Sequence, residues 1–357
     1  MTDWLIFPGA DADARAPRAS VPRAVLVWLW IVAALVFAMV IVGGATRLTQ
    51  SGLSITEWKP VTGALPPLSA EAWLAEFEKY KQIPQYRELF PTMDLAGFKY
   101  IYFWEWGHRL LGRLIGLVFA LPLAWFWLRG QLSARLKPRL LGLLALGGLQ
   151  GAVGWWMVAS GLVNRVEVAQ ERLAIHLMLA SLTFVWLVWI AVGLRAEGRE
   201  QAVSRGQRAL ASLLILVTLA QIGLGGLVAG LRSGLSYNTW PLMDGRFIPP
   251  WENLAKLAPG WANLLDNVTT VQFQHRMVAY LLLALALVHF VAAFRAARGS
   301  PACKRALGLL ALTLAQAGLG IAALLTHVQI HTALSHQAVA MLVLGMAVAG
   351  RRLLRRA

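Results

Sequence analysis

The sequence predicts an all-α, polytopic membrane protein whose eight transmembrane helices form two tandem parallel four-helix repeats. Of the 357 residues, 58% are hydrophobic and only 14% are charged. Eight apolar runs reach the length of about 20 residues that a helix needs to cross a bilayer. We place the eight spans at residues 25–44, 105–128, 139–160, 170–194, 209–230, 270–294, 304–326 and 331–350.

An internal repeat predicts the tandem arrangement. Ser51-Gly52-Leu53-Ser54 follows the first span, and Ser233-Gly234-Leu235-Ser236 follows the fifth. Each stands at the same distance after a glycine pair, Gly43-Gly44 or Gly225-Gly226, and a His-Arg pair opens the second and the sixth span. Because four helices return the chain to the same side, the two repeats are expected to be parallel. The predicted parts are an N-terminal cytoplasmic tail (1–24), a first repeat (25–194), a second repeat (209–350) and a basic cytoplasmic tail (351–357).

The net charge of +16 is explained by the placement of the basic residues. They gather in segments that alternating helices put on one side of the membrane, so the positive-inside rule places both termini in the cytoplasm. A nucleic-acid surface is the weaker interpretation. The residues are Arg15, Arg18, Arg23, Arg129, Arg135, Lys137, Arg139, Arg195, Arg199, Arg205, Arg208, Arg295, Arg298, Lys304, Arg305, Arg351, Arg352, Arg355 and Arg356.

The start of the sequence is acidic and has the character of neither a signal peptide nor a transit peptide. We therefore expect a multi-pass protein of a bacterial inner membrane. Cys303 is the only cysteine, so neither an intrachain disulfide nor a CxxC redox centre is expected.

Four histidines stand near the same end of four spans. His108 and His176 belong to the first repeat, and His275 and His336 belong to the second. Paired imidazoles from different helices of a bundle can ligate heme iron at both axial positions, so the sequence predicts two heme sites. A single membrane histidine is often only a packing residue, but four in duplicated contexts favour ligation. Zinc is disfavoured because no cysteine or carboxylate cluster completes a tetrahedral shell.

The two repeats differ at one ionisable position. Glu105 precedes His108 by three residues, so both project from one helix face, whereas Gln272 stands at the matching place before His275. A carboxylate near the membrane is costly and usually marks chemistry, which makes Glu105 the candidate catalytic residue. The alternative is an interfacial carboxylate that faces water or pairs with Arg109.

Arg109 and Arg276 follow the first histidine of each repeat. They are candidates to bind heme propionates, with interfacial snorkelling as an equally supported alternative. We interpret His289 as structural, and His327 and His331 as wet interfacial residues.

Ser69 is expected to cap a short helix that carries Trp73, Phe77 and Tyr80 on one stripe. That helix is interpreted as resting on the membrane, with a lid over the first site as the alternative.

These motifs together resemble heme A synthases of bacteria and mitochondria over nearly the whole chain. The resemblance implies an oxidoreductase that oxidises the C8 methyl of heme O to a formyl group through a hydroxymethyl intermediate, giving heme A for the terminal oxidase. It is carried by Gly43-Gly44-Ala45-Thr46-Arg47-Leu48-Thr49, Ser51-Gly52-Leu53-Ser54, Glu105-x-x-His108-Arg109, Asn238-Thr239-Trp240-Pro241-Leu242-Met243, Gln274-His275-Arg276, His176 and His336.

The resemblance also implies the role of each histidine pair. His275 and His336 are expected to be the axial ligands of a heme b cofactor, and His108 and His176 to face the substrate heme with Glu105 nearby. Heme O synthase and oxidase assembly factors are the expected partners, and the electron donor stays open. Some relatives carry a cysteine pair in an outer loop, which this sequence lacks.

Two other classes of protein were weighed. A diheme b-type cytochrome for quinone-linked electron transfer predicts equivalent halves, which the difference between Glu105 and Gln272 disfavours. A transporter built from parallel repeats predicts polar residues near the bilayer midplane, where this chain has few.

Overall fold

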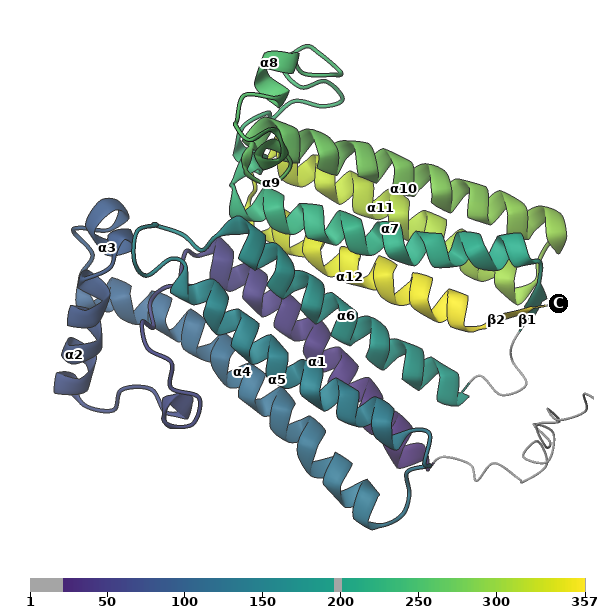
Figure 1. Ribbon diagram of the computed structural model, residues 1–357, viewed down its shortest axis with the longest axis horizontal. Helices are drawn as coiled ribbons and strands as arrows, with labels where there is room; N and C mark the ends of the chain where they lie inside the picture. The colour runs from purple at the N-terminus through teal and green to yellow at the C-terminus, as the bar shows by residue number, and fades with distance from the viewer. Residues whose placement is uncertain (1–21, 196–200, 357) are drawn as a thin grey trace, which may run out of the picture.

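The computed structural model describes residues 22–195 and 201–356. Within these ranges eight helices are long and apolar enough to cross a membrane, which confirms the predicted fold class. They are α1 (Arg23–Leu48), α4 (Leu95–Leu128), α5 (Lys137–Ala159), α6 (Gln170–Arg195), α7 (Arg205–Gly230), α10 (Val268–Ala296), α11 (Pro301–Leu325) and α12 (Ile330–Arg352). Figure 1 shows them as one bundle of long, roughly antiparallel rods.

Seven of these helices begin and end within four residues of the predicted spans, but α4 begins ten residues before the predicted start at 105. The cause is local. Asp94 caps the helix, since its carboxylate accepts a hydrogen bond from Gly97 N at 2.8 Å. Phe98 and Ile101 in the first two turns are buried, so packing stabilises a helical segment that lies outside the apolar run.

The long helices fall into two groups of four. In the first group α1 contacts α4 and α6, while α5 contacts α6; in the second, α7 contacts α10 and α12, while α11 contacts α10 and α12. The groups meet along α1, α6, α7 and α12 in the middle of the molecule (Figure 1). The interpretation of these groups as copies of one repeat stays a prediction.

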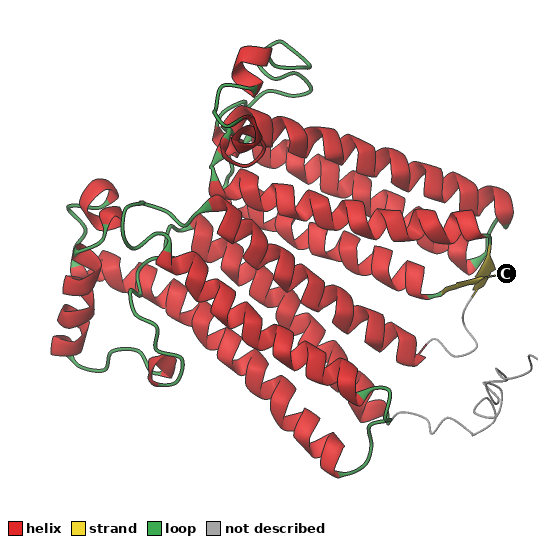
Figure 2. Cartoon of the chain, in the orientation of Figure 1, coloured by secondary structure: helices red, strands yellow, loops and turns green. Residues whose placement is uncertain are grey.

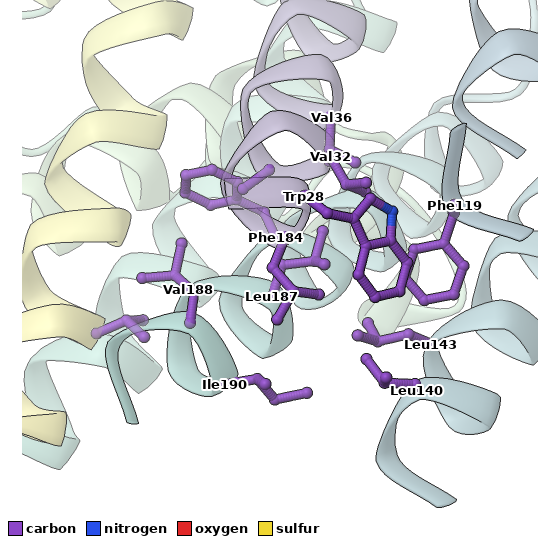
Figure 3. Close-up of a cluster of buried hydrophobic side chains, with 14 of the residues drawn as sticks. Trp28, Val32, Val36, Phe119, Leu140, Leu143, Phe184, Leu187, Val188 and Ile190 are labelled. Carbon is purple, nitrogen blue, oxygen red and sulfur yellow. The ribbon is translucent and has the colours of Figure 1, made fainter. Parts of the chain in front are cut away.

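A dense apolar core fills the first group away from its histidines. Trp28 of α1 lies against Phe119 of α4, with ring centroids 5.2 Å apart, and its indole N–H donates to Val118 O at 2.8 Å. Figure 3 shows this pair beside Leu140 and Leu143 of α5. Since protein interiors of this kind are close-packed, the core leaves the histidine-bearing half of the group as the region for a ligand.

The long connections lie at one end of the bundle, here called the histidine end (Figure 1). Residues 49–94 hold α2 (Ala70–Lys81) and α3 (Pro84–Leu89), and residues 231–267 hold α8 (Trp251–Leu254) and α9 (Asn263–Asp266). Single 3₁₀ turns occur at Thr62–Ala64, Ser233–Leu235 and Gly260–Ala262.

The short helix predicted after Ser69 is α2, and Ser69 caps it as expected by accepting a hydrogen bond from Ala72 N at 3.2 Å. Its apolar stripe is not left for lipid, however. Trp73, Phe77 and Tyr80 are buried against the first turns of α4, where Phe77 stacks on Phe98 with centroids 5.0 Å apart. The interpretation as a helix resting on the membrane is corrected, because the stripe packs inside the protein.

The opposite end, here called the terminus end, carries both ends of the described chain. There β1 (Gln201–Val203) pairs in parallel with β2 (Leu354–Arg356) (Figure 2). The segment predicted as a basic tail therefore continues α12 to Arg352 and then adds a strand. The predicted basic positions Arg15, Arg18 and Arg199 lie outside the described residues.

Candidate functional site

The four predicted histidines form two pairs, one in each group of helices. His275 of α10 and His336 of α12 face each other with ring centroids 6.4 Å apart and planes at 73°. In the first group His108 of α4 and His176 of α6 lie close enough to interact electrostatically. α4 and α6 do not pack against each other along the first group. This pair therefore meets across the middle of the bundle.

The spacing of the second pair suits a metal ion between the rings. Two imidazoles whose nitrogens each bind one first-row metal ion at about 2 Å have their centroids a little over 6 Å apart, given ring radii of about 1.2 Å. His336 is also oriented for ligation, since its Nδ1–H points at Gln316 O at 3.2 Å. Nε2 then keeps its lone pair, which is the usual arrangement of a metal-binding histidine.

A glycine lies against each of the four imidazoles, on a neighbouring helix. A Cβ at these glycines would stand within 3.4 Å of a ring atom, which is closer than ordinary van der Waals contact or at its lower limit. At Gly154 and Gly320 the Cβ would stand under 3.0 Å from the ring, so a side chain there would displace it; at Gly43 the contact would be tight, and at Gly225 it would be ordinary. The pairs are Gly43 with His108, Gly154 with His176, Gly225 with His275, and Gly320 with His336.

Glutamine amides surround the rings, and the sequence analysis assigned no role to them. Gln150 Nε2 lies 3.2 Å from His176 Nδ1, and Gln221 Nε2 lies 3.2 Å from His275 Nδ1. Both also donate to the backbone carbonyl of the same histidine. An amide inside an apolar span was the signal available in the sequence, since buried polar groups require partners. The residue that the predicted repeat matches to Gln221 is Met39.

Glu105 is buried with 2% of its surface exposed, and its carboxylate is fully bonded. Oε1 accepts from Arg109 Nη2 at 2.6 Å and from Arg109 Nε at 3.1 Å. Oε2 accepts from Ser54 Oγ at 2.7 Å and from Ile55 N at 2.8 Å. The carboxylate therefore holds the Ser51-Gly52-Leu53-Ser54 segment onto α4, one helical turn from His108. Of the alternative considered for Glu105, a carboxylate that faces water is excluded by this burial, whereas the pairing with Arg109 is present in the structure.

Arg109 and Arg276 each clamp a connecting loop as well. Arg109 donates to Ile55 O and Glu57 O, at 2.8 and 3.0 Å. Arg276 donates to Tyr237 O at 2.7 Å and to Gln272 Oε1 at 3.1 Å. Arg276 Nε is buried and has no partner among the described residues, so one N–H of this guanidinium is left for an acceptor that the chain does not supply.

The two groups differ in how far they close around their histidines. In the second group α10 packs closely along α11, whereas α4 touches α5 only sparsely. The residues on the facing sides follow the same trend. Gly112 and Gly116 of α4, and Gly147 and Gly151 of α5, are exposed; the residues matched to them, Ala279, Leu283, Thr313 and Ala317, are buried or half-buried.

Gly147 illustrates the difference. Nothing lies within 4 Å of the position its Cβ would take, although it shares a helix face with Gly154, which lies against His176. Its counterpart Thr313 is 4% exposed and packed inside the second group. The first group is therefore more open between α4 and α5 than the second group is between α10 and α11, while the four histidines are all half-buried.

Ion pairs tie the first loop to α2. Lys79 bonds Glu57 at 2.9 Å, and Lys59 bonds Glu76 at 3.2 Å. The ammonium groups of Lys59 and then Lys79 hold the pKa of the Glu57 carboxyl below its ordinary value. Because Arg109 bonds the carbonyl of the same Glu57, α2 and the α4 histidine helix are coupled through this loop.

A short path of side chains joins the two sites. Gln337 follows His336 on α12 and donates to Val40 O of α1 at 2.8 Å. Its side chain occupies the space beside Gly44, where any Cβ would clash with it. Gly43, which precedes Gly44 on α1, lies against His108. At the histidine end Glu167 adds a second link between the groups, pairing with Arg47 at 2.5 Å and Arg232 at 2.8 Å.

The fold and the sites define a polytopic helical membrane protein with two histidine pairs suited to heme. The family model COX15-CtaA, described as cytochrome oxidase assembly protein, matches residues 26–348, and the chain belongs to this family. The resemblance stated from the motifs is thereby confirmed.

Named relatives cover nearly the whole chain. The heme A synthase of Beijerinckia indica subsp. indica is 62% identical over 343 residues, which are 96% of this chain and 95% of that protein. The heme A synthase of Methylobacterium sp. (strain 4-46) is 59% identical over 99% of this chain and 98% of that protein. The heme A synthase of Agrobacterium fabrum is 55% identical over 92% of this chain and 89% of that protein. These matches support heme A biosynthesis and give no support to the diheme electron-transfer cytochrome.

Proposed function

We propose that this protein is a heme A synthase whose two histidine pairs do different work. The first pair, His108 and His176, receives heme O, and the second pair, His275 and His336, holds a resident b-type heme. The main support for this assignment is a structural difference between the two groups of helices. The first group is open between α4 and α5 and has a buried carboxylate beside its histidines; the second group is packed more closely between α10 and α11 and has Gln272 in place of the carboxylate.

The second pair fits a permanently bound heme. Its ring spacing of 6.4 Å accommodates an iron between two nitrogens. Gln316 O fixes the tautomer of His336, and the unpartnered Arg276 Nε suits a propionate. When bound there, the heme supplies one-electron chemistry, and the path from Gln337 to Gly43 leads from it toward the first pair.

The first pair fits a ligand that must enter and leave. Heme O carries a farnesyl tail, which partitions into lipid. An opening between α4 and α5 would let the macrocycle reach His108 and His176 while the tail stays in the bilayer. The glycines Gly147 and Gly151 keep that flank free of side chains.

Glu105 is the proposed catalytic residue. Each of two oxidations replaces a C–H bond of the C8 methyl with a C–OH bond, first giving a hydroxymethyl group and then a gem-diol, while an oxidant from outside the chain accepts two electrons; the gem-diol then loses water to leave the aldehyde. Each oxidation releases protons, and a carboxylate one turn from the ligand His108 is placed to accept them. Arg109 holds this carboxylate in position through two hydrogen bonds. The Ser54 hydroxyl, 2.7 Å from Oε2, offers the next step for a proton toward the loop.

The reaction class is that of an oxidoreductase acting on a methyl group. The protein would work in a bacterial inner membrane with both termini in the cytoplasm, since the described basic residues of the short connections lie at the terminus end. Heme O is taken over from its synthase, and heme A passes to oxidase assembly factors.

The test is pigment analysis of purified variants. His275→Ala or His336→Ala should abolish the low-spin b-type spectrum, because each removes one axial ligand of the same iron. His331→Ala, on the exposed first turn of α12, is the control and should retain the spectrum. A full-strength spectrum in the His275→Ala, His336→Ala double variant would refute the assignment of the resident heme.

A further inference from the structure

At the terminus end of the second group a small cavity lies between α7, α10, α11 and α12. Its volume is about 20 Å³, it is partly open, and it is lined by the guanidinium groups of Arg305 and Arg351 and by the imidazole of His289. The rest of the lining is mostly small and apolar, including Ala302, Ala347 and Gly350. The site is at the other end of the helices from the heme-binding histidines, and the proposed reaction does not use it.

Several polar N–H groups around this cavity are buried without a partner among the described residues. Two of the guanidinium nitrogens of Arg305, Nε and Nη2, are in this state, as is His289 Nδ1. Buried donors of this kind are normally satisfied, because an unmade hydrogen bond there costs free energy. Arg351 is bonded through Nε to Ser212 Oγ at 2.7 Å, which fixes its guanidinium beside the cavity.

No carboxylate among the described residues forms an ion pair with the arginines of this cavity. Every described aspartate and glutamate lies in the connections of the histidine end or in the helix turns next to them. Arg208 of α7 adds a further cation near Arg351, and its Nε is also buried without a described partner. Among the described residues the cavity is therefore a cationic site without a carboxylate beside it; Glu197 and Glu200 lie outside the described residues.

The first group has nothing comparable at the matched positions. His289 corresponds to Pro122, Arg351 to Ala191 and Arg208 to Leu26. Ala191 is fully buried in apolar core. Arg305 alone has a basic counterpart, Arg139, which is exposed at the start of α5. The positive-inside rule requires only that basic residues lie on one side of the membrane. It does not explain why a cluster with buried nitrogen atoms is present in the second group alone.

We propose that this cavity binds a phosphate-type oxyanion, namely the headgroup of an anionic phospholipid. Basic pockets between transmembrane helices are a recurrent way of holding such headgroups, and an arginine fork matches the geometry of phosphate oxygens. A cavity of this volume holds one oxygen-sized group. One phosphate oxygen therefore enters to meet Arg305 and His289, while the glycerol and acyl chains stay outside among lipids.

The proposal is tested by lipid retention and thermal unfolding of the full-length protein in detergent. Native mass spectrometry should show phosphatidylglycerol retained by the wild-type protein and phosphatidylcholine not retained. Added phosphatidylglycerol should raise the unfolding midpoint. Arg305→Gln should weaken phosphatidylglycerol binding about tenfold or more, the loss typical of one charge-assisted hydrogen bond. Arg139→Gln is the matched control and should bind as the wild type does.

A second variant separates the site from the charge. Gly350 lines the cavity, and among the described residues nothing lies within 4 Å of its Cβ position, so Gly350→Leu adds bulk at the cavity without a clash while the arginines remain, and it should also weaken lipid binding. Protection of the wild type, but not of Arg305→Gln, by inorganic phosphate alone would identify the free anion as the occupant of the same oxyanion site. Equal lipid binding by wild type, Arg305→Gln and Gly350→Leu would overturn the proposal.

Discussion

Glu105 and Gln272 make the same contact in the two groups of helices. Each bonds the arginine four residues further along its own helix, Glu105 with Arg109 at 2.6 Å and Gln272 with Arg276 at 3.1 Å. They differ in the hydrogen bonds that they make with the preceding loop. Glu105 accepts hydrogen bonds from the Ser54-Ile55 segment, whereas Gln272 donates to Ser233 O at 2.6 Å. The scaffold thus tolerates an amide at this place, and the carboxylate is a feature of the first group alone.

Because Gln272 stands at the matching position of the second group, Glu105→Gln tests the role of the carboxylate specifically. The protein should fold and keep its b-type heme, because Gln272 shows that an amide can bond the neighbouring arginine. Heme A formation should fall by about 10²–10⁴-fold if the carboxylate is a general acid–base group, and heme O or its hydroxymethyl derivative should accumulate. Chromatography of hemes extracted from cells that express the variant measures this.

His331→Ala, on the exposed first turn of α12, is the control and should leave heme A formation in place. Near-normal heme A in Glu105→Gln would reduce Glu105 to an anchor of the loop, and loss of all bound heme would make it a structural residue.

Gly320 should be intolerant of a side chain. A Cβ there would lie 2.8 Å from His336 Cε1, so Gly320→Ala must displace the imidazole or α11. We expect at least a partial loss of the low-spin b-type spectrum. Gly318→Ala is the matched control, since nothing lies within 4 Å of its Cβ position. Equal spectra for the two variants would contradict the close approach of α11 to His336.

The flank between α4 and α5 is tested by Gly147→Leu. A leucine on the face that also carries Gly154 would fill the opening, so heme O should accumulate while the b-type heme in the second group is retained. The neighbouring Gly148→Leu projects about 100° further around the helix and should have little effect. Heme A formation unchanged by Gly147→Leu would show that heme O enters by another way.

Topology gives a further prediction. Reporter fusions after residues 60, 135, 200 and 250 should read outside, inside, inside and outside, because the basic connections are expected in the cytoplasm. Any inverted reading would contradict the proposed orientation of the eight helices.

Much of this molecule is encoded locally and could be predicted. The eight spans follow from apolar runs, and the cap at Ser69 follows from its side chain. The pairing of His275 with His336 followed from their matched places in the repeat. The early start of α4 could not be predicted from hydropathy, because it depends on burial of Phe98 beneath α2, a tertiary contact.

The opening between α4 and α5 also could not be predicted from local sequence patterns. Gly151 belongs to an apolar span, and in the structure it is exposed. A glycine can bring helices together or leave space, and only the positions of α4 and α5 decide between the two. Gln221 was missed because its matched residue, Met39, carries no amide to mark the position.

The most direct test of the account is heme analysis in cells that make heme O but no heme A of their own. Expression of this chain should convert the extracted heme O to heme A, identified by chromatography and mass, while the purified protein carries b-type heme. Recovery of heme O alone from cells that contain the folded, b-type-heme-loaded protein would contradict the proposed synthase activity.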